Sequence, residues 1–270
     1  MNGRRVAALM SKELREMRSN PAAILPVVLL IALCLVLPFF VAIVLPVMTG
    51  ERLSSDHTIA EVLAFARTRL PGLDTLPPES AAQAFLFQQF LFLFLVAPIV
   101  GAVSLAAYAV VGEKQGRTLE PLLTTPLTTA ELLVSKVLAA FLPALAIEFC
   151  GLALYLVLTV TVAAPGVAGT LVSGRSLILI ALLGPLASLA ALQLTIAISS
   201  RVNDPRSAQQ IAVLLVLPLV LMLVGQVAGA FVITSSMLLM LCAGLAAIWL
   251  LLVFFSVALF DRESILTRWK

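Results

Sequence analysis

Six long runs of apolar residues alternate with short polar segments along this chain of 270 residues. A helix needs about 20 mostly apolar residues to cross a hydrocarbon core about 30 Å thick, and every run is long enough. A membrane barrel would need alternating apolar and polar residues, which the runs lack. The pattern therefore predicts an all-α membrane protein with six transmembrane helices. The runs fall at 22–48, 84–112, 132–162, 177–199, 209–232 and 236–260.

The composition excludes several classes of protein. Hydrophobic residues make up 61% of the chain and charged residues 11%, whereas about 25% of an ordinary soluble domain is charged. The three cysteines lie inside apolar runs and His57 is the only histidine, so we expect no disulfide in the polar segments and no metal site. The net charge of +3 is spread over several segments, which argues against nucleic acid as a partner.

Basic residues are distributed unevenly on the two sides of the predicted six-helix domain at 22–260. Thirteen of the 17 Lys and Arg residues lie on the side of the termini, where they include those of segments 113–136 and 200–210. The other four lie on the opposite side, three of them in segment 49–85. The positive-inside rule thus predicts a multi-pass protein of the cell (inner) membrane with cytoplasmic termini, a cytoplasmic tail at 261–270 and an extracytoplasmic segment at 49–85.

The residues before the first run predict an amphipathic helix at 1–21 that lies in the cytoplasmic interface of the membrane. A charged leader exposed to water is the alternative interpretation. The apolar face of the predicted helix consists of Val6, Leu9, Met10, Leu14 and Met17, and the opposite face of Arg4, Arg5, Lys12, Arg15 and Arg18. On the outer side, the helical spacing of four apolar residues predicts short interfacial helices within 49–85. These residues are Ile59, Val62, Leu63 and Ala66.

The polar segment between the second and third runs begins with signals that end one helix and start another. Gly112 should mark the end of the second span, because charged residues follow it and Gly116 can adopt the left-handed conformation of a helix cap. Thr118 can cap a new short helix, whose first turn tolerates Pro121 and favours Glu120. Leu119, Leu122 and Leu123 form the apolar face of this predicted helix.

The same segment closes with a second set of signals. Pro126 ends the short helix, and Thr128 with Glu131 matches a capping box at the start of the third span. Lys136 lies where that span enters the membrane. A connection between two spans usually needs only a few residues. The length of 113–136 therefore predicts a rigid helical connection, called the elbow below, whose surface can receive a mechanical displacement.

The run GEKQGRTLEPLLTTPLTTAEL at 112–132 resembles the signature of ABC-2 type permeases, the membrane subunits of ATP-driven exporters. Two weaker similarities support this. Lys12-Glu13-Leu14 with Arg18 resembles the family's N-terminal interface helix, and Ser199-Ser200-Arg201 with Asp204, Arg206 and Gln209 resembles its second cytoplasmic loop. Ser135 departs from the glycine that similar sodium-extrusion permeases often have. The family includes exporters of ions, drugs, peptides and lipid-linked molecules, so the resemblance singles out no substrate.

The resemblance implies that the elbow couples this chain to an ATPase. The coupling residues would be Gly112, Glu113, Gly116, Thr118, Leu119, Glu120, Leu122, Leu123, Pro126, Glu131 and Lys136, and the second cytoplasmic loop would contribute Arg201, Asp204 and Arg206. The chain has no phosphate-binding P-loop sequence. We therefore expect it to be no enzyme and to bind no cofactor, with ATP and Mg²⁺ held by two copies of a separate ATPase subunit. A second copy of this permease, or a related one, would complete the exporter.

Other intramembrane residues have both a functional and a structural interpretation. Glu148 falls near the middle of the third span, where an acid is either a substrate or proton contact of the transport pathway, or a protonated or hydrogen-bonded structural acid, for example one paired with Gln193 or Gln88. Gly225 and Gly229 have the spacing that lets two helices pack closely, either between permease copies or within the chain. A secondary ion-coupled transporter is the alternative function, although Glu148 is the one intramembrane charge that would support it.

Overall fold

The computed structural model describes residues 3–18, 21–68, 72–116, 128–199, 202, 204–214, 217–227 and 233–259. Within these ranges the secondary structure is helical, without a strand, which agrees with the predicted all-α class. The α-helices are α1 (Gly3–Arg18), α2 (Pro21–Phe39), α3 (Leu45–Thr49), α4 (His57–Arg67), α5 (Pro78–Gln115), α7 (Thr129–Val162), α8 (Val167–Leu171), α9 (Gly174–Ile178), α10 (Gly184–Ser199), α11 (Pro205–Val213), α12 (Leu217–Val227) and α13 (Ser235–Leu259).

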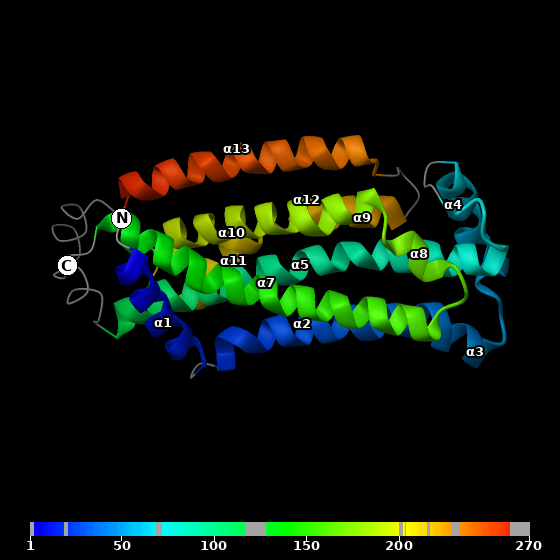
Figure 1. The fold of residues 1–270 in the computed structure, drawn as a ribbon, viewed down its shortest axis with the longest axis horizontal. Helices are drawn as coiled ribbons and strands as arrows, with labels where there is room; N and C mark the ends of the chain where they lie inside the picture. Colours follow the sequence, from blue (N-terminus) through cyan, green and yellow to red (C-terminus); the bar gives the residue numbers. More distant parts are fainter. Residues whose placement is uncertain are drawn as a thin grey trace.

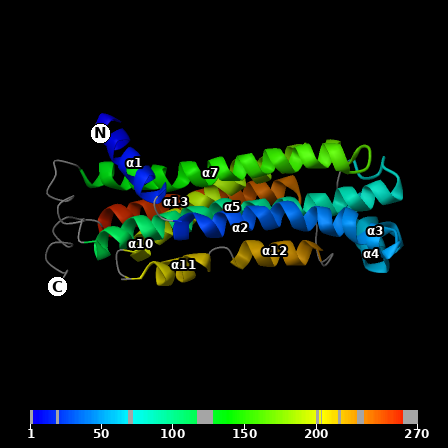
Figure 2. The same ribbon diagram turned by 90° about the horizontal axis from the view of Figure 1, so that it is seen from below.

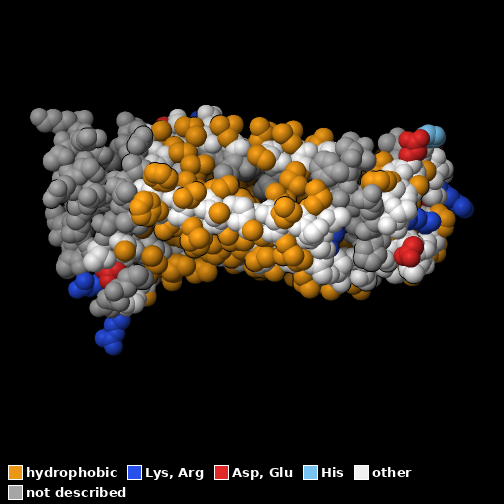
Figure 3. Space-filling model, turned by 90° about the horizontal axis from the view of Figure 1, so that it is seen from above, with side chains coloured by type: hydrophobic (Ala, Val, Ile, Leu, Met, Phe, Trp, Pro, Cys, Tyr) orange, Lys and Arg blue, Asp and Glu red, His pale blue; other side chains and the backbone are white. Residues whose placement is uncertain are grey.

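The long helices form an elongated bundle with their axes roughly parallel (Figures 1 and 2). Helix α1 crosses one end of the bundle, which we call the α1 end, and the last turns of α13 reach the same end (Figure 1). Helices α3 and α4 lie at the opposite end, which we call the α4 end. Hydrophobic side chains cover the middle of the molecule, and charged side chains lie mainly toward its two ends (Figure 3). This distribution is that of a protein whose middle is surrounded by lipid.

Five helical stretches of the described chain are long and apolar enough to cross a membrane. They comprise 24–49, 78–109, 130–162, 174–199 and 235–256, and each overlaps one of the predicted runs. In the predicted span at 209–232, the described residues lie in two shorter helices, the end of α11 and the whole of α12. Pro218 in the first turn of α12 cannot donate a hydrogen bond to the carbonyl of Leu214, and its ring crowds that carbonyl. The apolar pattern did not reveal this division of the run.

Two of the spans contain a short π-helical segment, at Phe40–Val44 and at Leu179–Leu183. A proline follows each segment by two residues, Pro46 in the first case and Pro185 in the second. The ring of a proline clashes with the carbonyl four residues earlier, and in both spans that carbonyl lies inside the π segment. The wider π turn relieves this clash, so both irregularities follow from local sequence.

Polar side chains join the spans in the half of the bundle near the α4 end. The buried hydroxyl of Tyr155 on α7 donates a hydrogen bond to the Phe87 carbonyl on α5 at 2.9 Å. The ring of Tyr155 packs against three phenylalanine rings, with centroids 5.1 to 5.9 Å away. Gln88 donates to the Thr170 carbonyl at 3.2 Å, and Gln83 accepts from the Ala164 amide at 3.1 Å. These contacts fix α5, α7 and α8 to one another.

The segment between α2 and α5 forms a cap at the α4 end of the bundle. Its predicted helix is present as α4, and Asp56 caps this helix by accepting from the Ile59 amide at 3.0 Å. Glu79 in the first turn of α5 accepts from the amides of Leu53 and Ser54, each at 3.1 Å. Because both carboxylate oxygens are used, the loop before α4 is fastened to the start of α5.

Candidate functional site

Helix α1 packs against the bundle through one face and exposes the other. Val6 and Leu9 are buried on the inner face, whereas Arg4, Arg5 and Arg15 are exposed on the outer face. The amphipathic helix predicted from the sequence is thus present. A third residue of the inner face is Glu13, which is only 1% exposed. A carboxylate at this depth needs a partner.

The partner of Glu13 is Lys136 on α7. Its ammonium nitrogen lies 3.0 Å from Glu13 Oε1, and it donates a second hydrogen bond to the Ala109 carbonyl on α5 at 3.1 Å. Lys136 is 2% exposed. Lys12 lies further away, with its nitrogen 3.9 Å from the same carboxylate oxygen. One buried cation therefore joins α1, α5 and α7 at a single point.

The pairing of Glu13 with Lys136 was not predicted. The sequence placed Lys136 where the third span begins and Glu13 within the N-terminal helix, but 123 residues separate them. One signal was present, because Glu13 has the helical spacing of Val6 and Leu9 and so falls on the apolar face. An acid on that face indicates a cation on the element that the helix covers.

The start of α7 next to this ion pair has the predicted capping box. The Glu131 amide donates to Thr128 Oγ1 at 3.2 Å, and the Thr128 amide donates to Glu131 Oε2 at 3.1 Å. Glu131 is 3% exposed. The two reciprocal bonds fix the direction in which the chain enters α7.

The stretch of α5 that is apolar enough to cross a membrane ends at Ala109, close to the predicted end of the span at Gly112, and the helix itself continues for six residues. Gly112 does not end the helix, which continues to Gln115, and the Gly116 amide still donates to the Gly112 carbonyl at 2.8 Å. Helical hydrogen bonding continued past Gly112 because Glu113, Lys114 and Gln115 are all compatible with a helix.

The middle of the predicted elbow lies outside the described residues. This applies to Thr118, Leu119, Glu120, Leu122, Leu123 and Pro126, and to the side chain of Glu113. The described chain therefore reaches the elbow from both directions, at Gly116 from α5 and at Thr128 from α7. The short coupling helix and its contacts stay predictions.

The second predicted loop lies at the same end of the bundle. Asp204 caps α11 by accepting from the Ser207 amide at 3.1 Å, and Arg206 is exposed. Gln209 donates to Ser104 Oγ on α5 at 3.2 Å. Arg201 lies outside the described residues. The structure thus links α11 to α5, the same helix that leads into the elbow.

Glu148 is completely buried near the middle of α7. Neither carboxylate oxygen has a hydrogen-bond partner among the described residues. The predicted pairing with Gln88 or Gln193 is therefore wrong, because the Gln88 amide donates to Thr170 instead and no contact joins Gln193 to the acid. The carboxylate lies beside Gly184, where a Cβ atom would come within 3.2 Å of Oε1. An acid left unpaired at this depth is unusual and is a candidate functional group.

The remaining predicted positions give less information. Gly225 is half-buried on α12, and Gly229 lies outside the described residues, so the predicted packing motif is not tested. Within the described ranges, no three His, Cys, Asp or Glu side chains gather where they could hold a metal ion.

The architecture defines a helical, multi-pass membrane protein, and comparison with protein families identifies which one. Residues 7–258 match the family model described as ABC-2 family transporter protein. Comparison with curated proteins and with solved structures found no match. The chain therefore belongs to the ABC-2 transporter family, as the resemblance of segment 112–132 indicated.

We expect the Glu13–Lys136 pair to matter for stability mainly when only one partner is lost. Lys136→Met should lower the free energy of unfolding by about 3 kcal/mol or more, because it leaves a buried carboxylate without its main partner. The double change Glu13→Leu, Lys136→Met should recover most of the loss. Thermal unfolding of the purified protein in detergent measures both effects.

Lys12→Met is the matched control for this experiment, since it removes the same type of side chain from a site that is 38% exposed. It should cost less than about 1 kcal/mol. A loss as large as that of Lys136→Met, or a double variant no more stable than Lys136→Met, would contradict the assignment.

Proposed function

We propose that the chain is the membrane subunit of an ATP-driven exporter whose ATPase is a separate polypeptide. The family assignment supports a transporter. One observation carries the proposal further: α1, α5 and α7 meet at Lys136. This lysine is the last residue of the elbow, and the Ala109 carbonyl that it contacts lies just before the elbow begins. The chain itself would bind no nucleotide, and ATP and Mg²⁺ would lie on two copies of the ATPase.

We place the α1 end in the cytoplasm. The basic residues of α1 and of segments 113–136 and 200–210 support this orientation through the positive-inside rule. We further propose that α11 and α12 together cross the membrane. They follow one another along the bundle (Figure 2), and α10 ends at the α1 end whereas α13 begins toward the α4 end (Figure 1). This gives six crossings and cytoplasmic termini in the cell inner membrane.

Movement of the ATPase would reach the spans through the elbow. Helices α5 and α7 have 38 and 34 residues and are each roughly 50 Å long or more. The capping box fixes how the chain enters α7, and the Lys136 contacts hold α7 against α5 and α1. A push on the elbow would therefore tilt these helices as a unit and change which side of the membrane the pathway opens to.

A second copy of the chain, or a related permease, would complete the transporter. Helix α13 supports this because it packs mainly against α10 and leaves large side chains exposed, with Met240 76% and Phe254 75% exposed. Glu148 favours the alternative function, an ion-coupled secondary transporter, because such proteins use intramembrane acids. The experiments below separate the two functions.

The orientation predicts which segments are accessible from each side of the membrane. Single cysteines introduced at Ser54 and at Ser207, on a background lacking the three native cysteines, should react from opposite sides. The one at Ser54 should react with a membrane-impermeant maleimide in whole cells, and the one at Ser207 only after permeabilisation. Labelling of both positions in whole cells, or of neither, would overturn the map.

We expect Glu148→Gln to alter transport without preventing assembly. The change keeps the size and removes the charge that an intramembrane pathway acid would contribute. Transport by reconstituted vesicles over a pH series measures the effect, and membrane abundance and copurification with the ATPase serve as controls. Gln193→Leu, a buried polar change on α10, is the comparison variant. Wild-type transport by Glu148→Gln at every pH would leave only a structural role.

The double change Leu122→Ala, Leu123→Ala should uncouple the chain from its ATPase. Removing a leucine from a buried interface costs about 1 to 2 kcal/mol, so two adjacent losses should severely weaken binding. Membrane insertion should be unchanged, because these residues lie between the predicted spans. The measurements are copurification with the ATPase and transport-stimulated ATP hydrolysis at equal membrane abundance.

Val47→Ala, Met48→Ala is the control, because these adjacent apolar residues of α3 are 79% and 73% exposed at the end of the bundle opposite the elbow. This variant should bind the ATPase normally. If the elbow variant also binds and stimulates normally, or if the native chain transports without any ATPase, the exporter proposal fails and the secondary transporter becomes the better account.

A further inference from the structure

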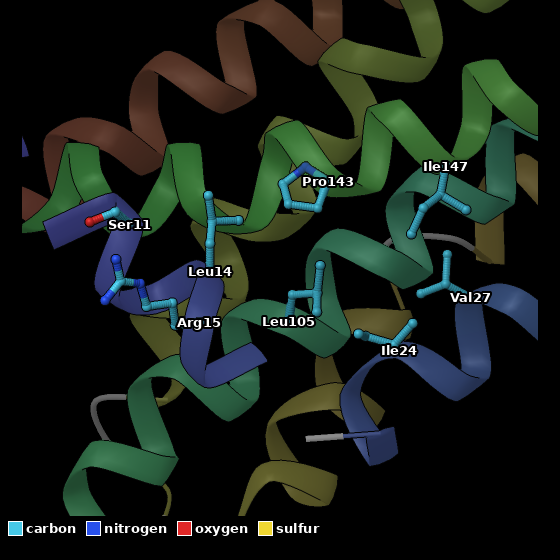
Figure 4. A pocket seen from close by; sticks show the side chains of 8 residues that line it. All are labelled: Ser11, Leu14, Arg15, Ile24, Val27, Leu105, Pro143 and Ile147. Atoms are coloured by element: carbon cyan, nitrogen blue, oxygen red, sulfur yellow. The ribbon is translucent and has the colours of Figure 1, made fainter. Parts of the chain in front are cut away.

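A cavity of about 440 Å³ lies between α1 and the spans at the α1 end of the bundle. Its volume is within the range of about 300 to 1,000 Å³ that is common for small-molecule sites. Figure 4 shows side chains from four helices around it. Those that matter here are Leu14 and Arg15 of α1, Ile24 and Val27 of α2, and Pro143 and Ile147 of α7.

The lining of the cavity has a polar side and an apolar side. The side chains from α2, α5 and α7 are all apolar, whereas both polar lining residues, Ser11 and Arg15, come from α1 (Figure 4). The Ser11 hydroxyl already donates its hydrogen bond to the Ala8 carbonyl at 2.7 Å, so a ligand does not need to supply an acceptor for it. Arg15 is exposed, and its guanidinium offers several hydrogen-bond donors to an anion. A ligand that fits this arrangement has an anionic group joined to an apolar chain.

The surroundings of the cavity indicate where such a ligand would come from. Leu25 and Val28, which neighbour the lining residues of α2, are 56% and 50% exposed on the lipid-covered surface. Leu142, next to Pro143 on α7, is 47% exposed. The apolar wall therefore continues into the surface that faces acyl chains. Water fills an apolar cavity poorly, so lipid is the material available to occupy it.

We propose that this cavity binds one phospholipid of the surrounding membrane, with an acyl chain against α2 and α7 and an anionic headgroup at Arg15. The guanidinium of Arg15, the basic residue that lines the cavity, attracts the anionic headgroup to this position. The proposal does not depend on coupling to an ATPase. Because the cavity lies between α1 and the spans α2, α5 and α7, the lipid gives α1 a point of attachment in addition to the Glu13–Lys136 pair.

The test uses the full-length protein, purified and depleted of lipid, with binding followed by native mass spectrometry. Phosphatidylglycerol and phosphatidylcholine with identical acyl chains are added in turn. The unaltered chain should bind phosphatidylglycerol more tightly. Arg15→Gln should weaken phosphatidylglycerol binding by roughly fivefold, the effect of one basic residue near a membrane surface, and should remove the preference. Ser11→Phe, which places a ring in the cavity, should weaken binding of both lipids.

Arg4→Gln is the matched control. Arg4 is exposed on the same side of α1 about three turns away and does not line the cavity. It should leave binding of both lipids unchanged. The proposal is overturned if Arg4→Gln weakens phosphatidylglycerol binding as much as Arg15→Gln, since attraction would then belong to the whole helix. Equal binding of both lipids by all four proteins would also overturn it.

Discussion

Lys136 needs a counter-charge because it is buried where α7 begins, and the α1 end of the bundle is arranged around that requirement. The carboxylate comes from Glu13 on α1, and the Ala109 carbonyl at the α5 end completes the contact. A buried ion pair contributes little net stability compared with an apolar pair of the same shape. The ion pair instead specifies how the three helices are arranged, because any arrangement that separated Glu13 from Lys136 would leave a buried charge unpaired.

The two halves of the bundle are held together differently. Near the α4 end, Tyr155, Gln88, Gln83 and Glu79 each make hydrogen bonds between separate elements. Toward the α1 end, Lys136 joins α1, α5 and α7, Gln209 joins α11 to α5, and the cavity lies beside α1. Because each polar contact restricts relative motion, the contacts at both ends are expected to make α5 and α7 move as one unit.

The middle of α7 lies beside an irregular part of the span at 174–199. Glu148 is buried without a hydrogen-bond partner in the described chain, next to Gly184 and the π segment Leu179–Leu183. Wide π turns are frequent at functional sites because they displace the backbone from regular helical bonding. The lack of a side chain at Gly184 leaves room for the carboxylate. These features place an acid in the centre of the bundle, beside an irregular part of the neighbouring helix.

The sequence by itself determined the membrane-spanning class, five of the spans, the amphipathic helix α1, helix α4 and the capping box of Thr128 and Glu131. It also determined the family, because the segment 112–132 carries a specific pattern. These features depend on composition, on helical spacing or on residues a few positions apart. Local sequence is therefore sufficient to encode them.

Only the tertiary structure decided which distant residues meet. It paired Glu13 with Lys136, left Glu148 without either predicted glutamine, and opened the cavity between α1 and α2. The continuation of α5 past Gly112 and the division of the predicted fifth span near Pro218 have local causes instead, which the apolar pattern alone does not show. Apolar periodicity gives the face of a helix but not the partner of that face. A contact such as Glu13 with Lys136 depends on how α1 is laid across the completed bundle, which no local segment specifies.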